Sequence, residues 1–445
     1  MMQCVVTSVQ RGNGFSPVGQ KTGENNVETY NKGQTKHIVM ETTQIVEEDV
    51  VIVGAGIAGL TTALGLHRLG VKFLVLESSD SLRVGGFALA ILENAWKALD
   101  AVGVGDILRR KHIHIHGNVT TSLITGKRIS IMPKDNKGEN EQRCVRRELL
   151  VDTLANELPS GTIRYLSKVV AVEKSSFSKI VHLADGTIIK TKVLIGCDGV
   201  NSVVAKWLGF KEATYTGRYG IRGWAEMESN HNIEPALMRF SGNDFRVVAV
   251  PCDEKSVYWF FTWTSSTIQD KILIENPTEL KQYVLNKLEK MPSEVRYFIE
   301  KTELHAFKLA PMRYRHPLEL IMGNISKDNV CVAGDAFHPM TPDLAQGGCS
   351  ALEDGVVLAR CLADAFTKKP EEEEDDQYKR IEEGLKKYAN ERRWRCIDLI
   401  TTSYIVGFVQ QGNSKLVTFI RDEFLGPLIA GQMIKKSKFN CGKLK

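Results

Sequence analysis

Residues 50–59, VVIVGAGIAG, decide the fold, because they join a continuous apolar run to a glycine turn that opens a helix. The apolar run is typical of a buried strand, and residues 57–69 carry small and apolar side chains at helical spacing. Gly70 ends that helix, and a second apolar run, 72–76, ends at Glu77. Strand, turn, helix and strand in this order predict the first unit of a doubly wound α/β sheet.

The three glycines of the turn have the spacing of a dinucleotide-binding fingerprint. Gly54 allows the tight turn, Gly56 lets a pyrophosphate approach the backbone, and Gly59 lets the helix pack closely on the strand. The helix N-terminus, which includes Ala58, offers N–H groups and a positive dipole end to the phosphates. Glu77 ends the second strand, and we expect it to accept hydrogen bonds from an adenosine ribose. The alternative is a glycine-rich turn without a ligand.

Length and composition describe an ordinary globular protein. The chain has 445 residues, of which 43% are apolar and 25% charged, and it has room for two or three domains. The 58 basic and 53 acidic residues are scattered and give a net charge of +5, so nucleic-acid binding has little support. No apolar run approaches the roughly 20 residues of a transmembrane helix. Nine cysteines without a Cys-x-x-Cys pair are interpreted as reduced thiols.

The first 39 residues are rich in Gly, Asn, Gln, Ser and Thr, with Glu24 and Glu28 as their only acidic residues. This composition predicts a disordered leader. Two explanations stay open: an organelle transit peptide, which implies a plastid location, or an extended gene model in which Met40 is the working start. Without a transit peptide we expect a cytoplasmic protein.

Further along the chain, patterns of apolar residues predict more strands. Residues 184–187 read as a hairpin turn, and residues 193–196 as a buried strand. Alternating Val, Phe, Tyr and Trp over about 219–264 predict a curved antiparallel sheet. Residues 330–333 form another apolar run, and a loop and a helix from about Ser350 are expected to follow it.

Three further segments occur in a fixed order. Arg147 opens the pattern R-x-x-L-x-x-x-L, residues 197–202 read CDGVNS, and residues 334–348 read GDAFHPMTPDLAQGG. Together with the glycine turn, over about residues 48–388, they resemble the single-component (group A) FAD-dependent monooxygenases. That family includes para-hydroxybenzoate hydroxylase, salicylate hydroxylase and zeaxanthin epoxidase.

Two shorter segments narrow the resemblance. Residues 83–89, RVGGFAL, and residues 94–96, NAW, are similar to the plant salicylate-hydroxylase-like branch. The resemblance implies an α/β fold: a glutathione-reductase-type Rossmann FAD domain, an inserted antiparallel-sheet substrate domain and a C-terminal helical region. The expected division is leader 1–46, FAD domain 47–111, 141–212 and 316–369, substrate domain 112–140 and 213–315, and acidic linker with helical region 370–445.

The resemblance also implies FAD and NAD(P)H as cofactors. Asp335 is expected to accept a hydrogen bond from a ribityl hydroxyl, and N–H groups near Gly347 to stabilise the reduced flavin. Arg147 is expected to pair with the FAD phosphate or ribose, although a lone Arg can also form a surface salt bridge. The expected cofactor-binding residues are Gly54, Gly56, Ala58, Gly59, Glu77, Arg83, Arg147, Asp198, Gly199, Asp335, Pro342, Gly347 and Gly348.

The implied reaction begins when NAD(P)H reduces FAD and the reduced flavin reacts with O2. A C4a-hydroperoxide then transfers one oxygen atom, by hydroxylation or epoxidation, to a small aromatic or isoprenoid-type metabolite of plant secondary metabolism. Arg222 is the leading candidate to hold a phenolate or carboxylate, and Tyr258 on the aromatic strand is the second catalytic candidate. A purely structural role in the sheet is the alternative for both. We expect a monomer or homodimer.

Two positions depart from the family pattern. Ala345 stands where the family has the first glycine of G-Q-G, so a positive backbone angle there would be unfavourable. Ala205 replaces the arginine that closes the second segment. These departures keep open an FAD-dependent oxidase or oxidative cyclase without NADPH coupling. A non-catalytic FAD-binding or regulatory protein is a third possibility.

The histidines suggest no metal centre. His112, His114 and His116 alternate with apolar residues, so a strand would place them on one polar face, without a nearby cysteine or carboxylate to complete a zinc site. His338 lies near the expected flavin site and acts either as a base or as a brace of its loop. The basic residues Arg392, Arg393 and Arg395 are assigned to the last helical region.

Overall fold

The computed structural model describes residues 45–82, 85, 87–132, 140–264, 276–367, 373–410 and 426–444. All of them belong to one unit, Thr43–Lys445. The expected leader up to residue 44, the cofactor residue Arg83 and residues 370–372 of the acidic linker lie outside the described residues. In the described part of the chain, no helix is both long enough and apolar enough to cross a lipid bilayer.

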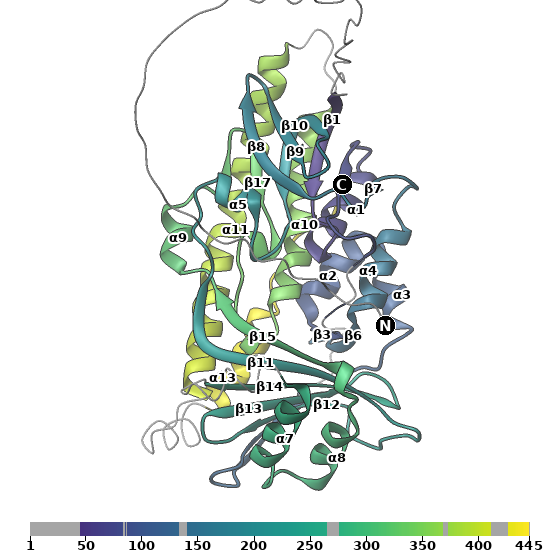
Figure 1. Ribbon diagram of the computed structural model, residues 1–445, viewed down its shortest axis with the longest axis vertical. Helices are drawn as coiled ribbons and strands as arrows, with labels where there is room; N and C mark the ends of the chain where they lie inside the picture. Colours follow the sequence, from purple (N-terminus) through teal and green to yellow (C-terminus); the bar gives the residue numbers. More distant parts are fainter. Residues whose placement is uncertain are drawn as a thin grey trace, which may run out of the picture. The chain divides into compact units, whose positions relative to one another are not determined.

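The first sheet is built around parallel strands, as the opening unit predicts (Figure 1). Its main path runs β16-β17-β10-β1-β2-β7, and β9 and β8 extend it antiparallel from β10. The bounds are β1 Ile45–Val53, β2 Leu74–Leu76, β7 Ile163–Arg164, β8 Val169–Ser175, β9 Ser178–Leu183, β10 Ile188–Gly196, β16 Ser326–Lys327 and β17 Val330–Val332. The predicted turn at 184–187 joins β9 to β10, and the predicted strands at 193–196 and 330–333 are confirmed.

Two helices pack closely on each other next to this sheet. Helix α1 (Ile57–Arg68) follows the glycine turn as predicted, and α10 (Gly347–Ala363) begins slightly before the expected Ser350. A Cβ at Gly65 would lie 2.6 Å from the Cβ of Ala359, and one at Gly355 would lie 2.6 Å from the Cβ of Thr61. Small residues on both helices therefore set their separation, which explains why α1 is buried on nearly every side.

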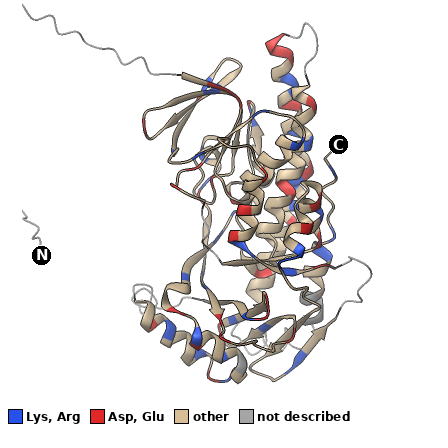
Figure 2. Ribbon diagram, turned by 90° about the vertical axis from the view of Figure 1, so that its right-hand side faces the viewer, with Lys and Arg blue, Asp and Glu red and all other residues tan. Residues whose placement is uncertain are grey.

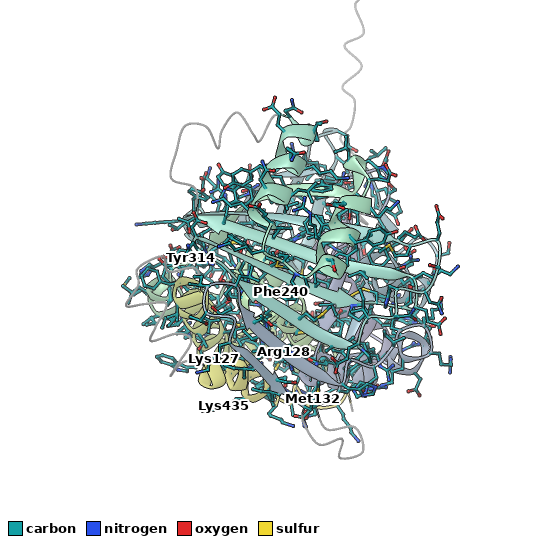
Figure 3. The ribbon with its side chains drawn as sticks, turned by 90° about the horizontal axis from the view of Figure 1, so that it is seen from below. Lys127, Arg128, Met132, Phe240, Tyr314 and Lys435 are labelled. Atoms are coloured by element: carbon teal, nitrogen blue, oxygen red, sulfur yellow. A yellow bond between two sulfur atoms is a disulfide. The ribbon has the colours of Figure 1, made fainter. Side chains whose placement is uncertain are left out.

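The second sheet confirms the predicted antiparallel sheet and extends it. Its order is β15-β11-β14-β13-β12-β4-β5, with β12 and β4 parallel. The bounds are β4 Gly117–Ser122, β5 Arg128–Ile131, β11 Thr214–Glu226, β12 Ala236–Ser241, β13 Phe245–Pro251, β14 Ser256–Thr264 and β15 Phe307–Tyr314. Arg128 of β5 and Tyr314 of β15, both labelled in Figure 3, belong to the two edge strands of this sheet.

The two faces of the second sheet pack against different partners. Ile221, Trp259 and Phe261 form a core with α7 (Pro277–Lys287) and α8 (Ser293–Lys301). On the other face, Trp224, Val248 and Tyr258 pack against the core of the first sheet. Since successive side chains of a strand point to opposite faces, this alternation places Arg222 on the face that meets the first sheet.

The remaining elements connect and cover the sheets (Figure 1). Strands β3 (Ala88–Ile91) and β6 (Arg143–Arg146) form a separate antiparallel pair. The other helices are α2 Glu93–Ala101, α3 Gly105–Arg109, α4 Arg147–Asn156, α5 Val203–Trp207, α9 Pro317–Met322, α11 Glu374–Gln410 and α13 Gly426–Lys436. Figure 2 shows acidic and basic residues interspersed along the ribbon, as the scattered charges of the sequence indicate.

Two expectations from the sequence are wrong. His112, His114 and His116 do not share a strand: only His114 forms an isolated bridge, whereas the buried His112 ring bonds the carbonyl oxygen of Leu108 at 2.8 Å. The cysteines are not all reduced thiols, because Cys144 and Cys252 form a disulfide. Their separation of 108 residues hides this proximity in the sequence.

Candidate functional site

Four parallel strands end level with one another, and this places the predicted cofactor segments together. Val53 of β1 pairs with Leu76 of β2 and with Gly196 of β10, and Gly196 pairs with Val332 of β17. The glycine turn, Glu77, Asp198 and Asp335 follow these strand ends within three residues. Ligands of open α/β sheets bind at such carboxyl edges.

The glycine turn has the geometry expected of a nucleotide site. Gly54 has φ +102°, and a Cβ there would lie 2.5 Å from the carbonyl oxygen of Cys197. A Cβ at Gly59 would lie 2.0 Å from the carbonyl oxygen of Gly54. Around Gly56, by contrast, a Cβ would meet no described atom within 4 Å. Two glycines therefore serve packing, while the third leaves open space beside the N-terminus of α1, where Ala58 lies.

Glu77 braces the turn. Its Oε2 accepts a hydrogen bond from the N–H of Ala55 at 2.9 Å, and its Oε1 accepts one from the N–H of Ser79 at 2.8 Å. The side chain is only 5% exposed. Glu77, the residue predicted to bind the ribose, thus also fixes the glycine turn to the end of β2.

The carboxylate of Asp198 forms its hydrogen bonds within its own loop. Its Oδ1 accepts a hydrogen bond from the Ser202 hydroxyl at 2.5 Å, and its Oδ2 accepts one from the N–H of Val203 at 2.7 Å. Burial raises the pKa of Asp198, and these hydrogen bonds oppose that rise. The adjacent Gly199 has φ +83°. Asp198 therefore shapes the turn in which Gly199 presents its backbone.

Asp335 has the opposite character. It lies in a 3-10 turn, η2 (Gly334–Ala336), after β17, and its carboxylate is exposed. The preceding Gly334 packs against α1, since a Cβ there would lie 2.8 Å from the Cβ of Ala58. The segment that begins at Gly334 therefore packs directly against the start of α1. Asp335 projects into solvent beside this contact.

The segment Pro342–Gly348 forms a tight connection into α10. Pro342 begins a 3-10 turn, η3 (Pro342–Leu344), and Ala345 follows with φ 55° and ψ 28° in the left-handed region. The family glycine is therefore replaced at a position that does require a positive φ, as the sequence suggested. Gly347 and Gly348 then open α10, so their N–H groups belong to the first turn of a 17-residue helix.

Arg147 is placed beside the loop that contains Gly85. Its Nη1 donates to the carbonyl oxygen of Gly85 at 2.8 Å, and its backbone N–H donates to that of Phe87 at 2.8 Å. The predicted phosphate or ribose contact of Arg147 thus lies at the segment that precedes β3.

A buried ion network stabilises the segment 334–346, which is predicted to contact the flavin. Asp354 on α10 accepts hydrogen bonds from the N–H of Gly334 at 2.8 Å, His338 Nε2 at 2.5 Å and Arg392 Nε at 2.7 Å. Its neighbour Glu353 pairs with Nη1 of Arg392 at 2.6 Å. The side chains of these four charged residues are fully buried.

The same network reaches the second half of the loop. The Nδ2 atom of Asn94 donates to Gln346 Oε1 at 2.9 Å and to Glu353 Oε1 at 2.5 Å. Arg395 of α11 also pairs with Glu353, at 2.9 Å. Helices α2, α10 and α11 thus fix both ends of the segment 334–346. Arg392 and Arg395 were assigned to the last helical region, but the sequence does not reveal that Arg392 is buried.

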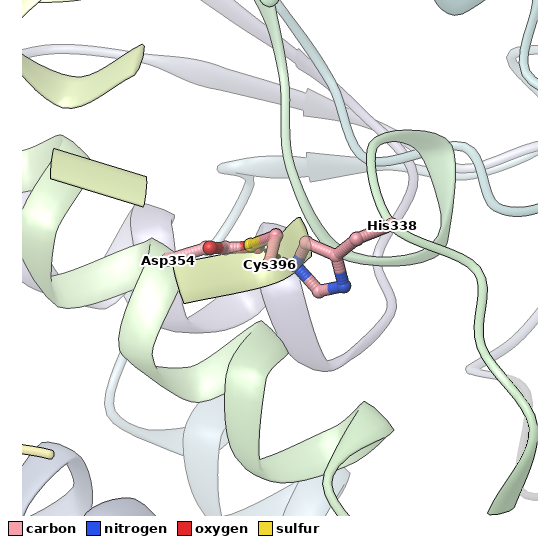
Figure 4. A group of neighbouring side chains, drawn as sticks. All are labelled: His338, Asp354 and Cys396. Carbon is pink, nitrogen blue, oxygen red and sulfur yellow. Dashed lines mark hydrogen bonds and ion pairs between the residues drawn. The ribbon is translucent and has the colours of Figure 1, made fainter. Parts of the chain in front are cut away.

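His338 braces the loop rather than acting as a base. Burial alone would lower its pKa, but the carboxylate of Asp354 holds the pKa well above its ordinary value. His338, Asp354 and Cys396 lie close enough together to resemble a metal site (Figure 4). Asp354, however, already accepts three hydrogen bonds from the protein, so we interpret the group as part of the ion network.

Arg222 and Tyr258 lie on neighbouring strands of the same sheet face. Arg222 pairs with Phe260, and Tyr258 pairs with Trp224, so Arg222 and Tyr258 are diagonal neighbours. Both are half-buried. Burial raises the pKa of the Tyr258 phenol, and the charge of Arg222 opposes that rise. The structure thus brings the two catalytic candidates together.

Four charged residues on and above this face were missed from the sequence. Arg218 Nη2 pairs with Asp343 at 2.9 Å, and Arg246 Nη2 pairs with the same carboxylate at 2.7 Å. Arg239 lies on β12, diagonal to Arg246. All four side chains are buried. Single arginines within otherwise apolar strands were the available signal.

Comparison with known proteins gives the family. A family model described as an FAD binding domain matches residues 47–390. Monooxygenase 2 of Arabidopsis thaliana is 51% identical over 401 residues, which cover 89% of this chain and 98% of that protein. Monooxygenase 1 of the same plant is 34% identical over 403 residues, 89% of this chain and 100% of that protein.

A solved structure has the same fold. Klebsiella pneumoniae HpxO in complex with FAD and uric acid superposes with a TM-score of 0.74 at 22% identity, covering 90% of this chain and 98% of that chain. The family model spans most of the chain and includes every predicted cofactor segment. The chain therefore belongs to the single-component (group A) FAD-dependent monooxygenases that share this FAD-binding domain.

Proposed function

We propose that this protein uses NAD(P)H, FAD and O2 to hydroxylate or epoxidise a small aromatic or isoprenoid-type metabolite. The observation that carries the proposal is the level ending of β1, β2, β10 and β17, which gathers the predicted cofactor segments at one edge. The family supports an FAD-dependent monooxygenase, and the NAD(P)H dependence and substrate class are proposed.

The residues at this edge fit FAD. The space beside Gly56 suits a pyrophosphate, since even a Cβ there would meet no described atom within 4 Å. Asp335 offers an exposed carboxylate, for which no partner is recorded among the described residues. A carboxylate of this kind suits a ribityl hydroxyl.

Each remaining cofactor residue has a proposed task. Arg147 and Arg83 bind the phosphate or ribose of FAD. Glu77 accepts a hydrogen bond from the adenosine ribose while it braces the glycine turn. Gly199 offers its backbone to the cofactor, in a turn that Asp198 stabilises. Pro342 shapes the loop into α10. The N–H groups of Gly347 and Gly348 stabilise negative charge at the helix start. FAD, when bound, supplies the redox chemistry that activates O2.

The substrate lies, in this proposal, against the sheet face that carries Arg222 and Tyr258. Arg222 holds a phenolate or carboxylate oxygen, and the protonated Tyr258 donates a hydrogen bond. Trp224 and Phe260 add apolar surface to the same face, which excludes water from the reacting atoms.

The proposed domain organisation follows the two sheets. Segments 47–111, 141–212 and 316–369 form a glutathione-reductase-type Rossmann domain for FAD, with 112–140 and 213–315 inserted as the substrate domain. Support comes from β4 and β5, which join the second sheet although FAD-domain segments lie on both sides of them in the sequence.

The test uses the purified protein. We expect a bound-flavin absorbance spectrum, and NAD(P)H and O2 consumption that candidate phenols stimulate. Turnover with O2 but without NAD(P)H would instead support the oxidase or oxidative cyclase, and a protein that does not bind FAD would refute every enzymatic function considered.

A glycine variant tests the site itself. Gly56→Ala should keep the melting temperature but weaken FAD binding at least about tenfold, because the methyl group occupies the pyrophosphate space. The matched control is Gly431→Ala on α13, where a Cβ also meets no described atom within 4 Å. Equal FAD affinity of the two variants would contradict the proposed phosphate contact.

A further inference from the structure

Helix α11 carries two apolar faces, and the fold covers only one of them. Cys396, Leu399 and Ile400 are buried against the rest of the protein. The other side of the helix has an exposed stripe of large apolar residues at helical spacing, which are Trp394, Tyr404, Ile405 and Phe408. A surface helix normally has one apolar stripe, which faces the core, and a polar face toward solvent. The second stripe of α11 therefore indicates a contact outside this chain's own core.

Helix α9 lies beside this stripe and extends it (Figure 1). The guanidinium of Arg393 on α11 donates to the carbonyl oxygens of Ile321 and Gly323, both at 3.2 Å. Leu318, Ile321 and Met322 of α9 are exposed, and Met322 is 77% exposed. The exposed apolar residues of the two helices together form the outer patch, which consists of Leu318, Ile321, Met322, Trp394, Tyr404, Ile405 and Phe408.

The helix beneath the outer patch is fixed by the fold. The hydroxyl of Ser403 donates to the carbonyl oxygen of Thr341 at 2.5 Å. One turn further, a Cβ at Gly407 would lie 2.3 Å from Oδ2 of Asp343, so α11 approaches that loop closely. The patch is therefore preformed, and a partner that binds it has little backbone to order.

The size of the outer patch matches one side of a stable protein interface. At roughly 200 Å² for a large side chain, the exposed fractions of its seven residues leave roughly 800 Å² of side-chain surface open to solvent. The largest apolar patch of a typical monomer covers roughly 300–600 Å². Each partner in a standard protein–protein interface buries roughly 800 Å².

The charges beside the outer patch favour a protein partner over a lipid surface. A helix that binds a lipid surface presents Lys and Arg beside its apolar face. Here Lys436 pairs with Asp398 at 2.5 Å, and Arg393 is bonded to the end of α9. Both cations are engaged within the fold, so they add little attraction to anionic lipids.

We propose that the outer patch is the interface of a homodimer, in which α11 and α9 pack against the same helices of a second copy of this chain. A two-fold interface requires a surface that is complementary to itself. Trp394 and Phe408 lie about two turns on either side of Thr401. An antiparallel pair of α11 helices centred near Thr401 therefore brings Trp394 against the partner's Phe408, as an aromatic pair.

The proposal selects the homodimer from the two oligomeric states that the sequence left open. It does not depend on the proposed reaction, because the outer patch contains none of the proposed cofactor or substrate residues. The test measures the mass of the purified full chain, with FAD added, by light scattering and sedimentation equilibrium at about 1–100 µM. We expect twice the mass of one chain, and a wild type that stays monomeric over this range overturns the proposal.

Charged variants locate the interface. Trp394→Glu and Met322→Glu should each raise the dimer dissociation constant at least about a hundredfold, because every dimer carries the change twice and buried aromatic or apolar anchors dominate interfaces. The matched control is Tyr297→Glu on α8, since Tyr297 is also an exposed large side chain, at 50% exposure. It should leave the dissociation constant unchanged.

Circular dichroism checks that each variant is folded, and Met322→Glu decides if Trp394→Glu is not. A dimer that persists in the folded variants, or one that Tyr297→Glu dissociates equally, overturns the proposal. Vesicles of phosphatidylcholine and phosphatidylserine test the lipid surface. A monomeric wild type that sediments with these vesicles, and a Trp394→Glu variant that does not, would assign the outer patch to lipid and not to a second copy.

Discussion

Arg392 and Arg239 are both buried arginines, but their surroundings act on them in opposite directions. Arg392 lies between Glu353 and Asp354, at 2.6 and 2.7 Å. Burial would lower its pKa, yet these carboxylates hold the pKa well above its ordinary value. At Arg239, burial and Arg246 together lower the pKa to about 9.

The contrast separates a buried charge that neighbouring carboxylates compensate from one that is compensated more weakly. The Arg392 network is satisfied by the protein itself and fixes the loop that carries Gly334 and Gln346. The guanidinium of Arg239, by contrast, has the thioether of Met433 as its recorded partner, and Arg239 lies on the same sheet face as Arg222 and Tyr258. Burial alone therefore does not show whether an arginine stabilises the fold; the charges next to it do.

The largest expected effect comes from breaking the Arg392 network. Arg392→Met leaves Glu353 and Asp354 buried without their main cation, which should lower the free energy of unfolding by about 3–5 kcal/mol. FAD affinity should fall with it, because the loop loses its brace. Chemical denaturation and flavin release measure the two effects.

The control for this variant is Lys386→Met on the same helix. Lys386 is 59% exposed and pairs with Glu382 four residues away, so its loss should change the unfolding free energy by less than about 0.5 kcal/mol. A similar loss from both variants would mean that the network contributes little more than surface charge.

A pH series sharpens the comparison through His338. Its pKa is raised above the ordinary 6.5 and that of Asp354 is lowered below 3.8. The stabilisation that His338→Gln removes should therefore be full between pH 3.8 and 6.5, and decline as the pH rises through the raised His338 value. It should also decline as the pH falls through the lowered Asp354 value. A difference between wild type and variant that grows above pH 6.5 would contradict this.

A smaller effect is expected at Ala345. It lies between Asp343, which pairs with Arg218 and Arg246, and Gln346 of the ion network. Ala345→Gly should raise the unfolding free energy by about 0.5–1 kcal/mol, because glycine tolerates the left-handed backbone but gains freedom when unfolded. Thermal and denaturant unfolding measure it. The same change at Ala155, in the right-handed helix α4, should instead lower the unfolding free energy by about 1 kcal/mol.

The smallest expected effect on stability is that of Arg239→Met. Because its charge is poorly compensated, its removal should change the unfolding free energy of the ligand-free protein by less than about 1 kcal/mol, in contrast to Arg392→Met. Denaturation of the two variants side by side is the measurement. If Arg239→Met lowers the unfolding free energy as much as Arg392→Met does, Arg239 also serves to stabilise the fold.

The sequence predicted the first β-α-β unit well, because its determinants are local. The glycine spacing, the apolar run before it and Glu77 after the second strand all act within one β-α-β unit, and the structure has strand, helix and strand there. Ala345 was also recognised, since a missing glycine is visible at a motif position. The histidines at 112, 114 and 116 misled, because alternation alone does not show that His112 bonds the preceding helix.

By itself, the sequence determined the family, the first strand–turn–helix–strand unit and the positions of several further strands along the chain. Only the tertiary structure decided which charges are compensated. Asp354 meets Arg392 across 38 residues, Arg218 meets Asp343 across 125, and Arg239 meets Met433 across 194. The energy of a buried charge depends on what lies within a few ångströms of it, and that distance follows from packing rather than from position along the chain.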